Sequence, residues 1–215
     1  MSKLLETTVF LACLALLAAC SDVTGLKGSG KMAKESRSPG SFHAIEIEIP
    51  AELSVTAGSP PTLSIETDDN LLPHVLTQVK DGVLKISSDG NLNMNKMAID
   101  AKTQSIDRLT VNGATKTHLI GLNGNAFALT ANGASEITAT GKVSQLTATL
   151  SGAGRLHAFE LPVSQAKVTI DGAGNAQVNA FDTLDVTVNG AGTVQYQGNP
   201  RVTQAIHGVG RVSQQ

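Results

Sequence analysis

The chain has 215 residues, enough for one domain or two small ones with a sizeable core. Hydrophobic residues make up 41% of it but aromatic residues only 3%, so Val, Ile, Leu and Ala must fill that core. The formal net charge of −2 excludes the strong positive field that recruits nucleic acid. Both cysteines, Cys13 and Cys20, lie near the N-terminus, which excludes a disulfide framework across the domain.

The first 20 residues have the pattern of a secretory signal peptide. A weakly positive start at Lys3 precedes the apolar run 9–17, which is too short to span a bilayer. The run ends in Leu-Ala-Ala-Cys at 17–20, a small-residue cleavage site followed by cysteine. This tetrad resembles the bacterial lipobox, whose cysteine is lipidated and becomes the mature N-terminus. We therefore predict a lipoprotein signal peptide over 1–19 and lipidation of Cys20; an ordinary signal peptide is the alternative.

The residues after Cys20 bear on location. Ser21 follows it instead of the Asp that tends to retain lipoproteins in the inner membrane of enteric bacteria, so an outer-membrane anchor is favoured in a Gram-negative host. Residues 20–40 are small, polar and glycine-bearing, which predicts a flexible, lipid-anchored tether. The predicted location is the cell envelope, and whether the domain faces the periplasm or the surface stays open.

Residues 41–106 read as an irregular β segment. Ile and Glu alternate over 45–49, which predicts a strand with one wet face, and the alternation resumes after Pro50. Asp81-Gly82 lies between two further β patterns and predicts a hairpin, because a type I′ turn needs positive φ at both positions. No long amphipathic helical pattern occurs in the sequence, so the predicted class is all-β.

A repeated unit over residues 107–211 organises the chain. Six times, a short alternating strand ends in a small-residue turn, and the first glycine of the turn recurs every 18–20 residues. These structural turn glycines are Gly113, Gly133, Gly152, Gly172, Gly190 and Gly208. A period of this size matches one coil of a solenoid. We therefore predict a parallel β-helix or β-solenoid with coils of roughly 18–20 residues.

Counting from each turn glycine predicts which positions point inward. Residues two, four and six before the glycine are apolar in nearly every copy, and a strand's period of two places them on one face. Gln204 breaks this pattern in the last copy. Glycine tolerates the positive φ of a corner, and we expect the alanine that usually follows it to fit a tight inner corner.

Several segments resemble a known family when taken in order. They are Phe42-His43-Ala44-Ile45, Leu53-Ser54-Val55-Thr56-Ala57-Gly58, Asp68-Asp69-Asn70-Leu71-Leu72 and Asp81-Gly82-Val83-Leu84-Lys85-Ile86. With the later Asn-Gly-Ala-Ser and Ser-Gly-Ala-Gly turns, they resemble the putative auto-transporter adhesin, head GIN domain family over roughly 41–211. The resemblance implies a secreted or lipid-anchored bacterial domain over 41–215 with a right-handed parallel β-helix. It implies no catalytic residues.

Metal or cofactor binding is not predicted. His118 and His157 share an outward column, but two coils separate them by about 10 Å, too far for one zinc ion. Among the turns only Asp171 is acidic, which argues against a calcium-binding β-roll. One outward column alternates in charge, which predicts salt bridges between neighbouring coils. It consists of Lys116, Glu136, Arg155, Asn175, Thr193 and Arg211.

The predicted function is a non-catalytic adhesion, binding or structural module of the cell envelope. Its predicted partners are the membrane, through lipidated Cys20, and a protein or glycan ligand; nucleic acid is not among them. The alternative is a polysaccharide-active β-helix enzyme. That alternative requires two or more carboxylates within about 10 Å of each other in a groove with aromatic walls.

Overall fold

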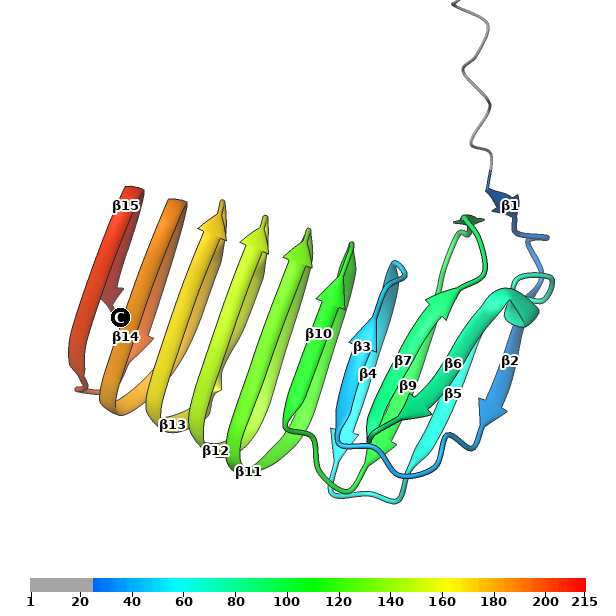
Figure 1. Ribbon diagram of the computed structural model, residues 1–215, viewed down its shortest axis with the longest axis horizontal. Helices are drawn as coiled ribbons and strands as arrows, with labels where there is room; N and C mark the ends of the chain where they lie inside the picture. The colour runs from blue at the N-terminus through cyan, green and yellow to red at the C-terminus, as the bar shows by residue number, and fades with distance from the viewer. Residues whose placement is uncertain (1–24) are drawn as a thin grey trace, which may run out of the picture.

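Strands stack side by side along one long axis in the computed structural model, which describes residues 25–215 (Figure 1). No helix among these residues is long and apolar enough to cross a membrane. The elements are β1 (Leu26–Lys27), β2 (Met32–Arg37), β3 (Ala44–Ile47), β4 (Ala51–Ala57), β5 (Thr62–Asp68), the 3₁₀ helix η2 (Leu72–His74), β6 (Val75–Lys80), β7 (Val83–Ser88), β8 (Leu92–Asn93), β9 (Ala98–Thr103), β10 (Arg108–Asn112), β11 (Thr115–Gly133), β12 (Ser135–Gly152), β13 (Arg155–Gly172), β14 (Asn175–Gln197) and β15 (Arg201–Gln214).

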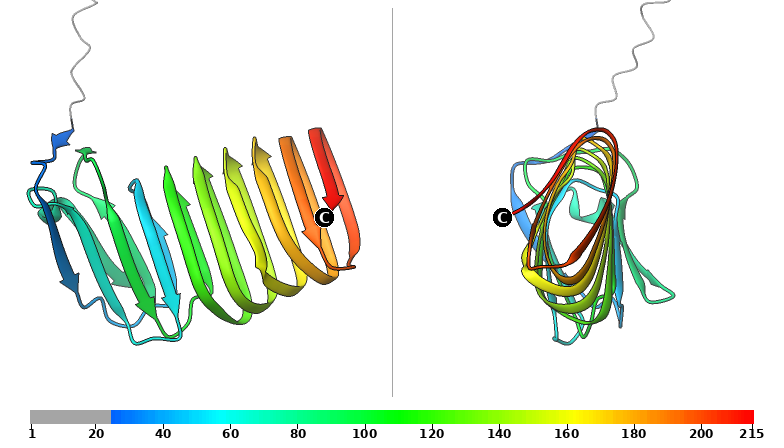
Figure 2. Two further views of the ribbon diagram at one scale, coloured as in Figure 1. Left: turned by 180° about the vertical axis from the view of Figure 1, so that it is seen from behind. Right: turned by 90° about the vertical axis from the view of Figure 1, so that its left-hand side faces the viewer.

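The six repeats form parallel coils, each with two extended legs joined at the glycine turn. We call the leg that ends at the glycine leg A and the leg that follows it leg B. Leg A of one coil pairs in register with leg A of the next, so Thr110, Thr130 and Thr149 lie side by side. Viewed down the axis, the coils superimpose as a flattened oval (Figure 2). The predicted right-handed parallel β-solenoid is confirmed.

The segment 41–106 adds two more coils to the same solenoid. β3 pairs in parallel with β10 as a leg A, and β4 pairs in parallel with β11 as a leg B. β7 and β9 extend the two sheets beyond β3 and β4. After β9 the chain passes back over β3 to begin β10, where the Asp107 amide donates to the His43 carbonyl at 2.9 Å. The coils at this end therefore do not stack in chain order.

Antiparallel strands close the N-terminal end of the solenoid. β6 forms the predicted hairpin with β7, and its turn residues Asp81 and Gly82 both have positive φ, 51° and 74°. On the leg B side, β5 pairs antiparallel with β9, and β2 pairs antiparallel with β5. The outermost strands at this end are therefore β6 and β2.

Residues 25–40 belong to the fold, which corrects the prediction of a flexible tether over this part of 20–40. β1 pairs with β8, and β2 is a full strand of the N-terminal sheet. The error has a physical origin, because an edge strand exposed on one face needs the same polar, charged composition as a linker. Residues 20–24, Cys20 among them, and the predicted signal peptide over 1–19 lie outside the described residues.

A clasp, made of residues 28–31 and 68–70, fixes the point where the chain joins the solenoid. The backbone amide of Ser29 donates to Asn70 Oδ1 at 2.8 Å, and that of Gly30 donates to Asp68 Oδ1 at 2.6 Å. The Ser29 hydroxyl donates to Asp69 Oδ1 at 2.6 Å, which lowers the pKa of Asp69. Because the folded-state pKa is lowered, this bond contributes stability above the unfolded pKa and loses it as the pH falls.

The predicted inward columns form the interior, but the corner differs from the prediction. Leu150 and Ile170, two residues before their glycines, are fully buried. The alanines after the turn glycines are exposed, and the residue beyond each alanine points inward instead. That inward position is glycine in four of the six copies for a packing reason. A Cβ at Gly174 would lie 3.0 Å from Ile170 Cγ2, so a side chain there would crowd the core.

The turn glycines stack directly on one another. Gly152 has a φ of +108°, and a Cβ placed there would lie 2.7 Å from the carbonyl oxygen of Gly133 in the preceding coil. Gly113 has a φ of +130° but has no atom within 4 Å of such a Cβ. Alanine at position 113 therefore meets backbone strain alone, whereas alanine at position 152 meets the strain and a collision with the preceding coil.

We predict that Gly152→Ala destabilises the protein about twice as much as Gly113→Ala. Alanine at position 113 meets only the left-handed strain, about 1–2 kcal/mol, whereas position 152 adds a clash with backbone that cannot move freely. Urea unfolding monitored by circular dichroism measures both changes in free energy. Equal losses would show that stacking of the corners does not limit the side chain.

We also predict that Gly28→Ala opens the clasp while Gly30→Ala leaves it closed. A Cβ at Gly28 would lie 2.3 Å from Asp68 Oδ2, but a Cβ at Gly30 has nothing within 4 Å and meets only the strain of a φ of +81°. Hydrogen exchange should show the Ser29 and Gly30 amides losing protection by roughly tenfold or more only in the Gly28 variant. Unchanged protection in that variant would contradict the proposed fit.

Candidate functional site: a polar hollow on the N-terminal sheet

Four strands present a polar outer surface at the N-terminal end of the leg B sheet. Their order across it is β2, β5, β9 and β4. The inward residues of these strands, such as Leu63 and Ile99, are buried in the core. Since side chains alternate along a strand, the residues between them face outward, and these are mostly Ser, Thr, Lys and Asp.

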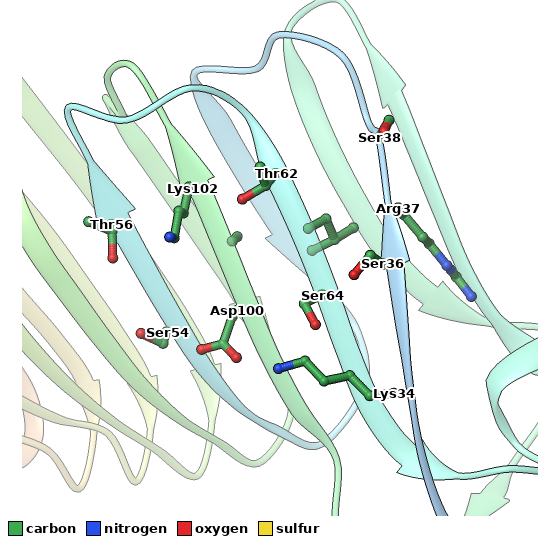
Figure 3. A pocket seen from close by; sticks show the side chains of 12 residues that line it. Lys34, Ser36, Arg37, Ser38, Ser54, Thr56, Thr62, Ser64, Asp100 and Lys102 are labelled. Atoms are coloured by element: carbon green, nitrogen blue, oxygen red, sulfur yellow. The ribbon is translucent and has the colours of Figure 1, made fainter.

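A hollow of about 570 Å³ lies on this surface (Figure 3). The antiparallel strands β2 and β5 lie beside parallel β9 and β4, so the hollow draws on residues distant in sequence. Its lining residues are Lys34, Ser36, Arg37, Ser38, Ser54, Thr56, Thr62, Leu63, Ser64, Asp100, Ala101 and Lys102.

One row of the hollow centres on a carboxylate. The strand register places Ser64, Asp100 and Ser54 side by side across β5, β9 and β4. The Ser64 hydroxyl is buried and has no hydrogen-bond partner among the described residues. Lys34 extends from β2 toward Asp100 (Figure 3). This row therefore offers an unused hydroxyl beside a cation and an anion.

A second row centres on a cation. Thr62, Lys102 and Thr56 are neighbours in the register across the same three strands. In the close-up view Lys102 lies between Thr62 and Thr56 (Figure 3). Two hydroxyls thus flank an ammonium group, an arrangement that can hydrogen-bond a hydroxyl or an anionic oxygen.

The charges in the hollow are available to a ligand. Within residues 25–215, Lys34, Lys102 and Asp100 form no ion pair within 4 Å. Arg37 differs, because its Nη1 donates to the Val75 carbonyl at 2.6 Å and its Nε pairs with Glu35 at 2.8 Å. Its side chain points away from the hollow (Figure 3), and its hydrogen bond lowers the pKa of Glu35. Arg37 therefore secures β2 and takes no part in the rows.

The outward columns of the later coils differ from the predicted salt-bridge ladder. Glu136 lies beside Lys116 and Arg155 in the register but within 4 Å of neither charge; it is 4.0 Å from His157 Nε2 instead. His157 Nδ1 contacts Gln177 Oε1 at 2.8 Å, and the Gln177 amide continues to Gln195 at 3.1 Å. The ladder in this region consists of hydrogen bonds that join His157, Gln177 and Gln195.

The other residues that the sequence pattern singles out lie in the corners and on the outward columns of the coils. The turn glycines Gly113, Gly133, Gly152, Gly172, Gly190 and Gly208 all have positive φ, between 108° and 144°. His118 and His157 lie in one outward column with Thr138 between them, so they do not converge on a common ion. Residues 25–215 contain no cluster of three His, Cys, Asp or Glu side chains that could hold a metal.

The hollow itself was not predicted from the sequence. Ser54, Thr56, Asp100 and Lys102 carry a signal, since they are outward positions of alternating strands, but that pattern occurs on every exposed sheet face. What brings them together is the order β2–β5–β9–β4, in which β9 lies between β5 and β4. One carboxylate, Asp100, lines the hollow, so the two-carboxylate arrangement of the enzyme alternative is not met there.

These observations define a right-handed β-solenoid with a polar hollow near the closed end. The chain belongs to the family described as "Putative auto-transporter adhesin, head GIN domain", whose model matches residues 41–200. None of the curated proteins matches the chain at a significant level.

Solved structures share this fold. A putative adhesin from Bacteroides fragilis is 20% identical with a TM-score of 0.75, over 89% of this chain and 100% of that one. A putative lipid binding protein from Parabacteroides distasonis is 18% identical with a TM-score of 0.51, over 88% and 99%. A putative adhesin from the same species is 23% identical with a TM-score of 0.50, over 88% and 99%. The likeness shows that this fold occurs in proteins with little sequence in common.

Proposed function

We propose that the protein is a cell-envelope lipoprotein whose solenoid is a non-catalytic binding module, and that the hollow binds a glycan. The observation that carries the proposal is the pair of rows centred on Asp100 and Lys102, with the unpartnered hydroxyl of Ser64 in the floor. The adhesin description of the family supports a binding role.

The chemistry of the hollow favours a polyhydroxylated ligand with an anionic group. Sugar hydroxyls both donate and accept, so they can pair with Ser and Thr hydroxyls and with the Asp100 carboxylate. An acidic substituent can lie between Lys34 and Lys102, which have no carboxylate partner within 4 Å in residues 25–215. No aromatic side chain lines the hollow, so a sugar ring finds no stacking platform and each site binds weakly.

Within this proposal, anchoring at Cys20 offsets the weak binding of individual sites. Many copies held on one membrane act together, and avidity then exceeds the affinity of a single hollow. Cys20 precedes Gly25, where the described structure begins, by five residues, so the tether spans at most about 18 Å. The hollow is built by β2, β4, β5 and β9, at the end of the solenoid where the chain enters.

We predict that the Lys34→Ala/Lys102→Ala double variant of a chain beginning at Ser21 loses binding to acidic glycans by about tenfold or more. Each lost charge-assisted hydrogen bond is worth about 1.5–3 kcal/mol. Arg108→Ala/Lys167→Ala is the matched control, because it removes two cations from exposed positions on the leg A face. Glycan-array binding followed by calorimetry measures the effect. Equal losses in both variants, or no acidic glycan bound by the parent chain, would reject the assignment.

We predict that Cys20→Ala abolishes labelling with palmitate and releases the protein from the membrane fraction. Cys13→Ala is the control, since it replaces the other cysteine within the apolar run and should leave labelling intact. Metabolic labelling of both full-length variants in a bacterial host measures the outcome. Normal labelling of the Cys20 variant would disprove the lipoprotein assignment.

A further inference from the structure

The two ends of the solenoid treat their exposed edges differently. At the N-terminal end the outermost strands β2 and β6 are six residues long and charged, with Lys34, Glu35 and Arg37 on one and Lys80 on the other. Short, charged edges resist pairing with another sheet. This end is therefore protected against association.

The C-terminal end has a longer edge that carries fewer charges for its length. β15 is 14 residues long and has β14 as its only strand neighbour among the described residues. Ile206 is 37% exposed, whereas Val188, the same inward position one coil earlier, is fully buried. Its charged residues are Arg201 and Arg211, and the stretch 202–210 between them contains no Lys, Arg, Asp, Glu or Pro. β15 thus leaves backbone hydrogen-bonding groups unpaired and leaves the end of the apolar core exposed to solvent.

We propose that a second copy of this chain covers β15, joining two solenoids end to end about a two-fold axis. The open coil offers two half-strands that run in opposite directions, leg A over 201–208 and leg B over 210–214. A single extended peptide can pair with only one of them. A second copy related by a two-fold axis pairs with both half-strands at once. Leg A of each copy then lies antiparallel to leg B of the other, and the unpaired backbone groups of both half-strands find partners.

The register follows from the corner. If the corners at 208–210 of the two copies lie at the same height, residue 204 opposes 214, residue 206 opposes 212, and residue 205 opposes 213. Inward residues then face inward residues, so exposed Ile206 is buried against Val212 of the second copy. The outward Arg211 opposes His207 and not another arginine. The pairing therefore matches polarity and places no two arginines opposite each other.

This register accounts for Gln204, the one polar residue in its inward column. Gln204 opposes Gln214, whose amide nitrogen already donates to the Gly198 carbonyl at 2.7 Å. The Gln214 carbonyl oxygen can accept from Gln204 in the second copy. The two-fold axis makes two such pairs, and polar pairs in an apolar interface fix register at some cost in stability. Gln204 thus selects one alignment of the two open coils.

The closed end limits the assembly to two copies. A head-to-tail stack would place β15 against β2 and β6, whose charges oppose pairing, so no filament grows. The chain enters the fold at β1, which pairs with β8 in the corner between β7 and β9, on the same long edge as the glycine turns (Figure 1). The two-fold axis runs parallel to the legs, so both chains enter on the same side. If Cys20 is lipidated as proposed above, one membrane can anchor both copies.

Engineered disulfides test the register directly. A chain beginning at Ser21 keeps residues 25–215, which hold all the strands and core described above, and it contains no cysteine. We predict that Ala205→Cys/Ser213→Cys forms a covalent dimer under mild oxidation, because opposed residues of antiparallel strands come close enough for a disulfide. Each single variant is a matched control and should give little covalent dimer, since its cysteine opposes no other cysteine in this register.

Sedimentation equilibrium of the parent chain completes the test. The expected result is a reversible dimer that Ile206→Glu weakens by tenfold or more and that Thr203→Glu, an outward change on the same strand, leaves intact. The proposal is overturned if the parent chain stays a monomer up to about 0.5 mM. It is also overturned if the single and double cysteine variants cross-link equally. Should Ile206→Glu unfold, Gln204→Lys serves in its place. None of these readouts depends on glycan binding or on lipidation, so they stand apart from a failure of the proposed function.

Discussion

Stacking of the coils at the glycine corners is the constraint on which the rest of the structure depends. A Cβ at Gly152 would lie 2.7 Å from the carbonyl of Gly133, and a Cβ at Gly172 would lie 2.6 Å from that of Gly152. The corners can approach this closely only because no side chain separates them. Their alignment holds leg A of each coil in register with the next, and the register in turn sorts every side chain inward or outward. Columns of Val, Leu, Ile and Ala then fill a flat interior that has little room for aromatic rings.

A structure held by contacts between neighbouring coils must solve the problem of its two ends. At the N-terminal end the solution is a change of strand direction: β5, β2 and β6 pair antiparallel and cover the parallel coils. The same change widens the leg B sheet and brings four strands from distant parts of the chain under one polar surface. The hollow is therefore a consequence of closing the solenoid, and it occurs where the regular repeat stops.

Patterns with a short period predicted the fold, whereas contacts between distant segments escaped prediction. The 18–20-residue spacing of the glycines and the alternation around Leu150 are local, and the coils follow from them. The hairpin at Asp81-Gly82 is equally local. The hollow depends on β9 lying between β5 and β4, which no alternation in 98–103 reveals. The composition of β2 predicts a tether, because exposed edge strands and linkers share a polar, charged composition.

The corner illustrates how a correct pattern can carry a wrong assignment. Glycine and alanine recur together, and the smaller side chain of alanine suggested an inner position. A strand's period of two instead makes the residue after the alanine the inward one, and glycine is common there because Ile170 fills the space opposite Gly174. The alanine is outside, where its small size is compatible with a sharp corner and no packing demands it. Val209, which replaces alanine in the last copy, is 83% exposed, in line with an outward position.

The regular coils between the two ends act as a spacer of fixed geometry. Each coil contacts only its neighbours, so a substitution on the outward face of one coil has little effect on the hollow or on β15. Substitutions can therefore change the hollow at the closed end without changing the unpaired strand at the open end, and the reverse. Addition or loss of whole coils changes only the distance between them.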